Sequence, residues 1–316
     1  MKLLAFTVLA ISLCPTISAG QARPTTTALQ RPEAVSLLGR PLFPPELPKG
    51  QKEKLLEQYL AAKADYDVDP ANPDRIIWFG RRAAYLWRYR EAIEIFSKGI
   101  EEHPADPRLY RHRGHRYITV REFTKAIEDL RKAAELTSGR PDEIEPDGQP
   151  NEKNIPTSTL NSNIWYHLGL AYYLRGEFSR ALEAYRECMR FSTNDDMMCA
   201  TADWLYMTLR RLDRPCEATE ILTKIHDKMS IIENFIYHKR LLMYKGVIPV
   251  DSLLSPEGLN DLDLATQGYG VANWKYYNGQ HERAGELFGQ IIEGSYWAAF
   301  GYIAAEAELF RTQRKR

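Results

Sequence analysis

Small and apolar side chains recur along this chain at spacings of three and four residues, and the pattern returns after 34 residues. Gly80 and Gly114 are 34 positions apart, and so are Ala92 and Ala126. Spacings of three and four residues place side chains on one face of a helix. A period of 34 residues that holds two such stretches predicts pairs of helices, which bury their apolar faces by stacking on neighbouring pairs.

The pattern is most complete after residue 161. Trp165, Leu168, Gly169 and Tyr172 form one stripe of a first helix, and the stretch reads W-x2-LG-x2-Y-x3-G-x-F-x2-A-x3-Y. This spacing resembles the signature of the tetratricopeptide repeat. The resemblance implies an all-α, right-handed solenoid of helix pairs and, in general, an adaptor that holds another protein. It also extends to exported bacterial repeat proteins that have no assigned role.

The repeats occupy most of the chain, and Asn72-Pro73 and Asp106-Pro107 mark two helix starts, each with a capping side chain followed by proline. We predict a solenoid over residues 50–316, with a terminal capping helix over 296–311. Clear repeats are predicted at 73–106, 107–140 and 162–195, and degenerate helix pairs at 199–229, 231–256 and 260–295.

Two segments interrupt this plan. Residues 21–49 contain six prolines and are predicted to form an extended arm. Residues 139–161 form a polar insert that breaks the 34-residue register. An insertion of this length within a compact array is either functional or disordered. Both interpretations stay open from the sequence.

The N-terminus has the pattern of a signal peptide. Lys2 precedes an apolar run from Leu3 to Leu13, and Ser18-Ala19-Gly20 provides small residues for cleavage. We therefore predict that residues 1–20 are removed and that the mature protein is exported, to the periplasm or to the medium. The alternative is an uncleaved membrane anchor. No later apolar run approaches the length of about 20 residues that a membrane crossing needs.

The charge balance limits the choice of partner. The chain carries 42 basic and 42 acidic residues, and loss of residues 1–20 removes only Lys2 among the charged ones. Binding to nucleic acid relies on a large positive field. We therefore expect no nucleic-acid partner.

The family resemblance places a ligand groove on the first helices of successive repeats. The candidate groove residues are Arg81, Tyr85, Arg108, Arg111, His112, His115, Asn163, Tyr166, His167, Tyr173 and Trp204. Arginine and tyrosine suit a peptide that carries carboxylates, because arginine pairs with them bidentately. The predicted partner is thus a protein or peptide. The alternative is that the arginines form a solvated helix face balanced by glutamates such as Glu91 and Glu94.

A different function remains open, namely binding of a small molecule or glycan. Its aromatic pocket would be lined by Tyr166, Tyr173, Trp204, Tyr269 and Tyr276. A deep apolar pocket would favour this function, and an open groove would favour a protein partner.

The sequence predicts no catalytic activity. The chain has no phosphate-binding glycine loop, no G-x-S-x-G and no H-E-x-x-H. His112, His115 and His167 could approach one another, but lone helical histidines are ordinarily packing or surface residues. We predict no catalytic residue, no cofactor and no metal site.

Three cysteines remain after removal of residues 1–20. Cys188 ends one second helix and Cys199 begins the next first helix, so they lie near the same end of the stack. Cys216 should lie at the opposite end. A Cys188–Cys199 disulfide is the one bridge the plan permits, and three free thiols are the alternative.

Overall fold

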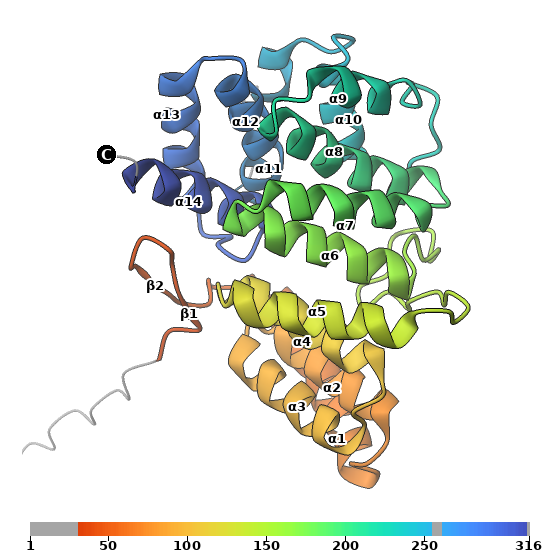
Figure 1. Cartoon of the computed structure of the whole chain (residues 1–316). Coiled ribbons are helices and arrows are strands. Elements are labelled where there is room, and N and C mark those ends of the chain that lie inside the picture. Colours follow the sequence, from red (N-terminus) through yellow and green to blue (C-terminus); the bar gives the residue numbers. More distant parts are fainter. Residues whose placement is uncertain (1–30, 255–260, 315–316) are drawn as a thin grey trace, which may run out of the picture. The chain divides into compact units, whose positions relative to one another are not determined.

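The computed structural model describes residues 31–254 and 261–314, and helices make up most of that part of the chain (Figure 1). The predicted signal peptide and the first part of the predicted arm, residues 21–30, lie outside the described residues. Helix α1 (Lys49–Val68) packs against the first repeat. The repeats that follow supply α2 (Pro73–Tyr85), α3 (Tyr89–Glu102), α4 (Pro107–Thr119), α5 (Phe123–Thr137), α6 (Leu160–Arg175) and α7 (Phe178–Arg190).

Local capping sets where these helices begin. The Asn72 side chain accepts hydrogen bonds from the backbone N–H groups of Asp74 and Arg75, at 3.0 and 3.3 Å. Asp106 accepts from the backbone of Arg108 at 2.9 Å. These bonds satisfy N–H groups that have no partner within the helix. The Asn-Pro and Asp-Pro signals in the sequence therefore locate α2 and α4 correctly.

Glycine allows the two helices of a pair to approach. A Cβ atom added at Gly169 would lie 2.8 Å from the Tyr185 ring of the paired helix, and one added at Gly80 would lie 2.5 Å from Phe96. Real Cβ atoms do not come this close to ring carbons. The 34-residue recurrence of glycine therefore reflects the spacing between paired helices.

The pattern loosens towards the C-terminus. Helices α8 (Asp195–Arg211) and α9 (Pro215–Leu222) still pair, and α10 (Phe235–Tyr244) packs on α8. The next elements are the 3-10 turn η1 (Val250–Leu254), the short α11 (Asp261–Asp263), the π-helical turn η2 (Leu264–Gly268), α12 (Tyr269–Tyr277) and α13 (His281–Ile291).

The final helix, α14 (Phe300–Gln313), has a different position from the one that we predicted for a cap on the end of the stack. It packs against α13 and also against α12 and α6 (Figure 1). Arg311 donates from Nη1 to the carbonyl of Leu174 at 2.8 Å. The C-terminal segment thus returns to the middle of the array.

The predicted extended arm is wrong for residues 34–42. Strands β1 (Ala34–Val35) and β2 (Pro41–Leu42) form an antiparallel hairpin, in which Ala34 faces Leu42. Both of these side chains are buried. The hairpin docks on the C-terminal region, since Trp297 donates from Nε1 to the Phe43 carbonyl at 2.6 Å. The prolines suggested an extended segment, but buried apolar side chains between them anchor it.

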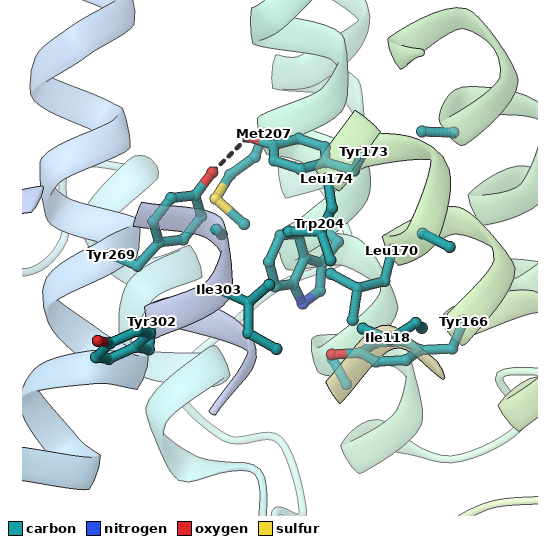
Figure 2. Packing of buried hydrophobic residues seen from close by; sticks show 14 of the residues in the cluster. Ile118, Tyr166, Leu170, Tyr173, Leu174, Trp204, Met207, Tyr269, Tyr302 and Ile303 are labelled. Atoms are coloured by element: carbon teal, nitrogen blue, oxygen red, sulfur yellow. Dashed lines mark hydrogen bonds between the residues drawn. The ribbon is translucent and has the colours of Figure 1, made fainter. Parts of the chain in front are cut away.

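An aromatic cluster fills the space between the middle and C-terminal helices (Figure 2). The Trp204 ring of α8 lies 5.2 Å from the Tyr173 ring of α6 and 5.8 Å from the Tyr269 ring of α12, measured between centroids. The Tyr269 hydroxyl donates to that of Tyr173 at 2.9 Å. Aromatic pairs at such separations contribute beyond their buried area.

Among the helices of the described ranges, none combines the length and the continuous apolar character that a membrane crossing requires.

Candidate ligand groove

One cavity of about 510 Å³ lies along the first helices of successive repeats. It is lined by seven of the predicted groove residues, namely Arg81, Tyr85, Arg111, His115, Asn163, Tyr166 and His167. They come from α2, α4 and α6, and α2 and α6 each contact α4. We refer to this cavity as the groove. Because the repeat places the same helix face inward each time, residues far apart in the sequence meet there.

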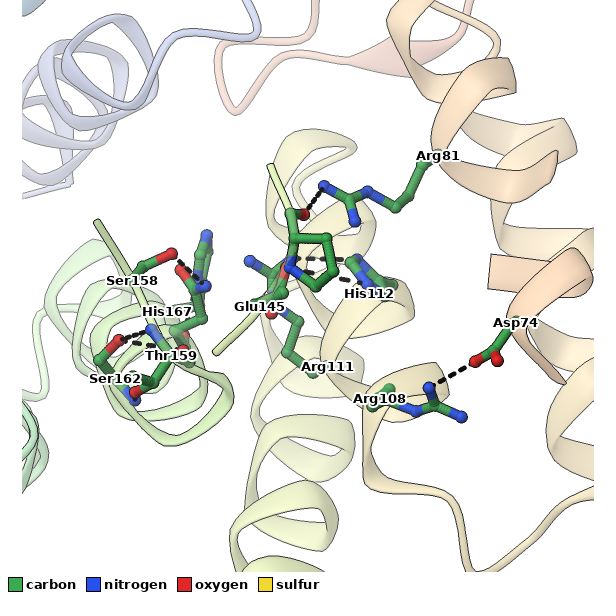
Figure 3. A network of polar contacts seen from close by, with 12 residues as sticks. Asp74, Arg81, Arg108, Arg111, His112, Glu145, Ser158, Thr159, Ser162 and His167 are labelled. Carbon is green, nitrogen blue, oxygen red and sulfur yellow. Dashed lines mark hydrogen bonds and ion pairs between the residues drawn. The ribbon is translucent and has the colours of Figure 1, made fainter. Parts of the chain in front are cut away.

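The arginines are held in fixed positions. The Arg81 guanidinium lies 4.6 Å from the centre of the Trp78 ring, a cation–π distance. Arg111 is only 7% exposed, and its Nε lies 2.9 Å from a carboxylate oxygen of Glu145. Its Nη1 donates to Nδ1 of His112 at 3.0 Å (Figure 3). The His112 ring therefore carries its proton on Nε2 and is neutral.

Three histidines gather beside these arginines. The His115 and His167 rings lie 4.2 Å apart, and the His112 ring stacks on Phe96 at 5.6 Å. Burial lowers the pKa of each histidine well below 6.5, and the positive charge of Arg111 or Arg116 lowers it further. The histidines thus supply neutral rings.

A smaller cavity of about 120 Å³ adjoins the groove on the side of α4. Arg81, Arg111 and Arg116 line it, and Glu145 is the one acidic residue of its lining within the part of the chain that the structure describes. Burial lowers the pKa of Arg116 to about 10, so this guanidinium is charged at neutral pH. This end of the groove therefore has an excess of positive charge.

The insert, which the sequence left without an assigned role, contributes directly to the groove. Glu145, Pro146, Asp147 and Gly148 line it, together with Thr157 and Ser158. The acidic residues of the insert were the feature of the sequence that could have indicated this contribution. Glu233, Tyr237 and Phe300 also line the groove, and sequence reasoning missed them, since only the fold brings these distant positions together.

Four of the predicted groove residues do not line the groove. Tyr173 and Trp204 are 0% and 1% exposed and belong to the aromatic cluster, because α12 and α14 cover them. His112 is buried behind Arg111 and lines only the smaller cavity. Arg108 points out of the groove.

The contacts of Arg108 explain why its side chain points out of the groove and not into it, as predicted. Its guanidinium bonds to the capping carboxylate of Asp106 at 2.6 Å. It also bonds to Asp74 of the preceding repeat, at 2.6 Å (Figure 3). The bonds to Asp106, followed by those to Asp74, raise the pKa of Arg108. Its charge is therefore neutralised outside the groove, so the predicted pair Arg108–Arg111 is divided.

The aromatic pocket predicted for a small ligand does not assemble as such. Tyr173 and Tyr269 are fully buried, and the Tyr276 ring contacts the Arg211 guanidinium and packs edge-on against His281. Trp204 instead borders a separate cavity of about 240 Å³, which Phe300 and Tyr237 share with the groove.

The two cysteines of the predicted bridge are free, buried thiols in the structure. The Cys188 thiol donates to the Ser162 carbonyl at 3.3 Å, whereas the Cys199 thiol contacts the Met229 sulfur at 3.8 Å. Burial raises the pKa of each thiol to about 12, which makes both poor nucleophiles. Cys216 is free and exposed. Within residues 31–254 and 261–314, no three His, Cys, Asp or Glu side chains are arranged so that they could hold a metal ion.

The comparisons with known proteins agree with this architecture. The family model described as Tetratricopeptide repeat matches residues 162–195. This chain contains a tetratricopeptide repeat. The predicted resemblance is therefore confirmed, and the matched stretch coincides with the third predicted repeat.

Two curated proteins are similar to parts of the chain. Human tetratricopeptide repeat protein 13 is 31% identical over 121 residues, which are 37% of this chain and 12% of that protein. The bovine BBSome complex member BBS4 is 21% identical over 204 residues, which are 65% of this chain and 32% of that protein. The chain thus matches a third or less of either relative's length.

Two solved structures of tetratricopeptide repeat proteins are also similar to this chain. A tetratricopeptide repeat protein from Parabacteroides merdae shares 13% identity with a TM-score of 0.47, over 83% of this chain and 99% of that one. YrrB, described as a TPR protein with an unusual peptide-binding site, shares 14% identity with a TM-score of 0.42, over 81% of this chain and 98% of that one.

Proposed function

We propose that this protein is an exported, non-catalytic scaffold whose groove holds an extended acidic segment of a partner protein. Helix-pair repeats of this family support a role in protein interaction. The observation that supports an acidic segment as the ligand is the positive charge that the helices place at one end of the groove. They present Arg81, Arg111 and Arg116 around one small cavity, whose acidic lining residue, Glu145, comes from the insert.

The groove has the chemistry to hold such a segment. Guanidinium groups pair with carboxylates through two parallel hydrogen bonds and also donate to backbone carbonyls. Tyr85 and Tyr166 add flat apolar surface with a polar tip, a combination that commonly anchors interfaces. The neutral histidines add no charge that would need a counter-ion.

Export is proposed from the N-terminal pattern of Lys2, the apolar run and Ser18-Ala19-Gly20. The test is expression of the full chain in a bacterium, with fractionation and mass measurement. An exported product that begins at Gln21 supports the proposal. A product that keeps residues 1–20 in the membrane fraction contradicts cleavage.

Binding is tested with defined peptides. We would measure fluorescence anisotropy with labelled ten-residue peptides that contain either glutamate or glutamine at matched positions. The glutamate peptides should bind more tightly, and the difference should shrink as salt is raised. Arg111→Ala should reduce binding about tenfold or more, as expected for loss of a charge-assisted contact.

Arg108→Ala is the matched control, because this arginine has the same charge but points out of the groove. Equal binding of glutamate and glutamine peptides, or equal losses from Arg108→Ala and Arg111→Ala, would contradict the proposed role of the groove.

A small ligand remains a second candidate because of the cavity beside Trp204. The Trp204 Nε1 and Arg240 Nε atoms are buried and have no hydrogen-bond acceptor among the described residues, and both side chains border this cavity. A carbonyl-bearing apolar compound would supply acceptors. A rise in melting temperature that Trp204→Phe abolishes would support this function, and no rise with any carbonyl-bearing compound would count against it.

A further inference from the structure

The insert crosses the groove in the manner of a bound peptide. Its base is a short antiparallel pairing, in which Ile144 lies opposite Thr159. The chain then runs from α4 towards α2, so that Glu145 meets Arg111, and the Pro146 carbonyl accepts from Arg81 Nη2 at 2.8 Å (Figure 3). Two residues later, the Gly148 carbonyl accepts from Arg82 Nη1, also at 2.8 Å.

These contacts involve one carboxylate and two backbone carbonyls. A peptide of another molecule can present the same groups in the same order. We propose that residues 145–148, Glu-Pro-Asp-Gly, are an internal ligand that covers the groove, and that the partner displaces them with a Glu-x-x-Gly segment of its own. This inference rests on the proposed function, since it names the partner's recognition sequence and the regulation of that same site.

The glycine of this sequence packs closely against two side chains of α2. A Cβ atom added at Gly148 would lie 1.7 Å from the Tyr85 hydroxyl oxygen and 2.8 Å from Arg81 Nη2. A larger residue could remain only if Tyr85 and Arg81 moved, and Arg81 is the donor to the Pro146 carbonyl. The groove as it stands therefore favours a glycine three positions after the glutamate.

The cover can leave without unfolding the repeats, because separate contacts hold its base. The Leu160 N–H donates to the Glu143 carbonyl at 2.8 Å, and Asn161 donates from its backbone and its side chain to Asp142 at 3.1 and 3.0 Å. These bonds tie the insert to the start of α6. They do not involve the arginines that hold residues 145–148.

The third residue of the cover is poorly accommodated. Asp147 Oδ2 is buried and makes no hydrogen bond in the described chain; the same holds for Glu145 Oε2, but Glu145 has an ion pair with Arg111 and Asp147 has none among the described residues. Burial raises the pKa of this carboxyl, and the nearby negative charge of Glu233 raises it further. A buried acceptor without a donor and a repulsive neighbour both weaken binding. A partner with a neutral residue at this position therefore binds better than the cover does.

The test uses mature protein (residues 21–316) and a labelled peptide with the sequence of residues 142–150, DEIEPDGQP. In the Gly148→Leu protein the cover does not fit, so we expect the peptide to bind at least tenfold more tightly than to wild type. A covering segment in the same chain competes at a high effective concentration, which explains this gain. A peptide with Asn in place of Asp147 should bind more tightly still.

The controls separate the interpretations. Gly289→Leu adds the same side chain at a helical position with no atom within 4 Å, and it should bind the peptide as wild type does. A peptide with Leu in place of Gly148, or Gln in place of Glu145, should lose most of its affinity. Hydrogen exchange should show faster exchange of the Glu145 amide, which donates to the Ser158 carbonyl at 3.2 Å, in Gly148→Leu and unchanged protection of α5 and α6.

Suppose that hydrogen exchange shows the cover to be released in Gly148→Leu. Equal peptide affinity of this variant and wild type would then overturn the inference and leave the proposed function intact. Absence of binding by both proteins, to this and to other acidic peptides, would overturn the proposed function as well. Glu145→Gln releases the cover by a different route and should reproduce the gain in affinity if Gly148→Leu folds poorly.

Discussion

The inward face of the repeats, formed by α2, α4, α6 and α8, has different environments at its two ends. At the α2–α4 end, Tyr85 and Arg111 line a cavity that a polar insert covers. At the α6–α8 end, Tyr173 and Trp204 belong to an aromatic core, and Trp204 also borders the separate cavity of about 240 Å³. The repeat pattern places all four residues on the inward face.

The difference comes from what packs on that face. At the α6–α8 end, Tyr173 accepts hydrogen bonds from Tyr269 and Asn273 of α12, both at 2.9 Å. Arg211 at the end of α8 pairs with Glu308 of α14 at 2.9 Å. A repeat motif therefore identifies the inner face of a solenoid, but elements outside the repeat decide whether that face is open to a ligand.

Truncation of the core aromatic should have the largest effect. Trp204→Ala leaves a cavity in the cluster and should lower the free energy of unfolding by about 3–5 kcal/mol. Tyr85→Ala, at the open end, should cost about 1 kcal/mol or less, because this ring is only half-buried. Urea unfolding measures both values. Similar losses for the two variants would remove the distinction between the two ends.

The ion pair that closes the α6–α8 end should come next. Glu308→Gln leaves Arg211 and Arg311 without their buried counter-ion and should cost about 3 kcal/mol. Glu286→Gln breaks an exposed pair with Arg283 and should change stability by no more than about 0.5 kcal/mol. Thermal unfolding of both variants checks this, and a neutral result for Glu308→Gln would show that α14 does not depend on its charge.

A fall in pH should destabilise the protein through the histidines at the groove end. The pKa values of His115 and His167 are lowered in the folded protein, so the unfolded chain binds more protons below its histidine pKa of about 6.5. Stability should therefore fall as pH drops below about 6.5, by up to about 1.4 kcal/mol per pH unit for each histidine.

Asp203 acts in the opposite direction, because burial raises the pKa of its carboxyl to about 6, and its protonation favours the folded state as pH falls. The histidine effect is therefore measured as the difference between wild type and His167→Gln in urea unfolding at pH 5.5 and 7.5. The variant should show the shallower pH dependence. Parallel curves would indicate that His167 is protonated in the folded state.

The smallest effect is expected for Arg108. Its ion pair with Asp74 is partly exposed, so Arg108→Ala should change stability by about 0.5 kcal/mol or less. It should also leave peptide binding unchanged. A loss of binding comparable to that of Arg111→Ala would extend the groove to the outer end of α4.

Much of this arrangement could be predicted from local signals. The 34-residue recurrence, the Asn-Pro and Asp-Pro caps and the third repeat locate α2 to α7 within a few residues. Seven of the predicted groove residues do line one cavity. The helix starts could be predicted because helix caps and the inward face of a repeat depend on residues close together in the sequence, whereas the role of the cavity as a ligand site stays a prediction.

The sequence by itself determined the helix pairs, the inward face and the basic character of its first part, all of which follow from short-range periodicity. Only the tertiary structure decided that α14 packs over the far end, that residues 34–42 form a docked hairpin and that Glu145 meets Arg111. These outcomes depend on contacts between distant segments. Their energy comes from burial and charge pairing, which no local pattern encodes.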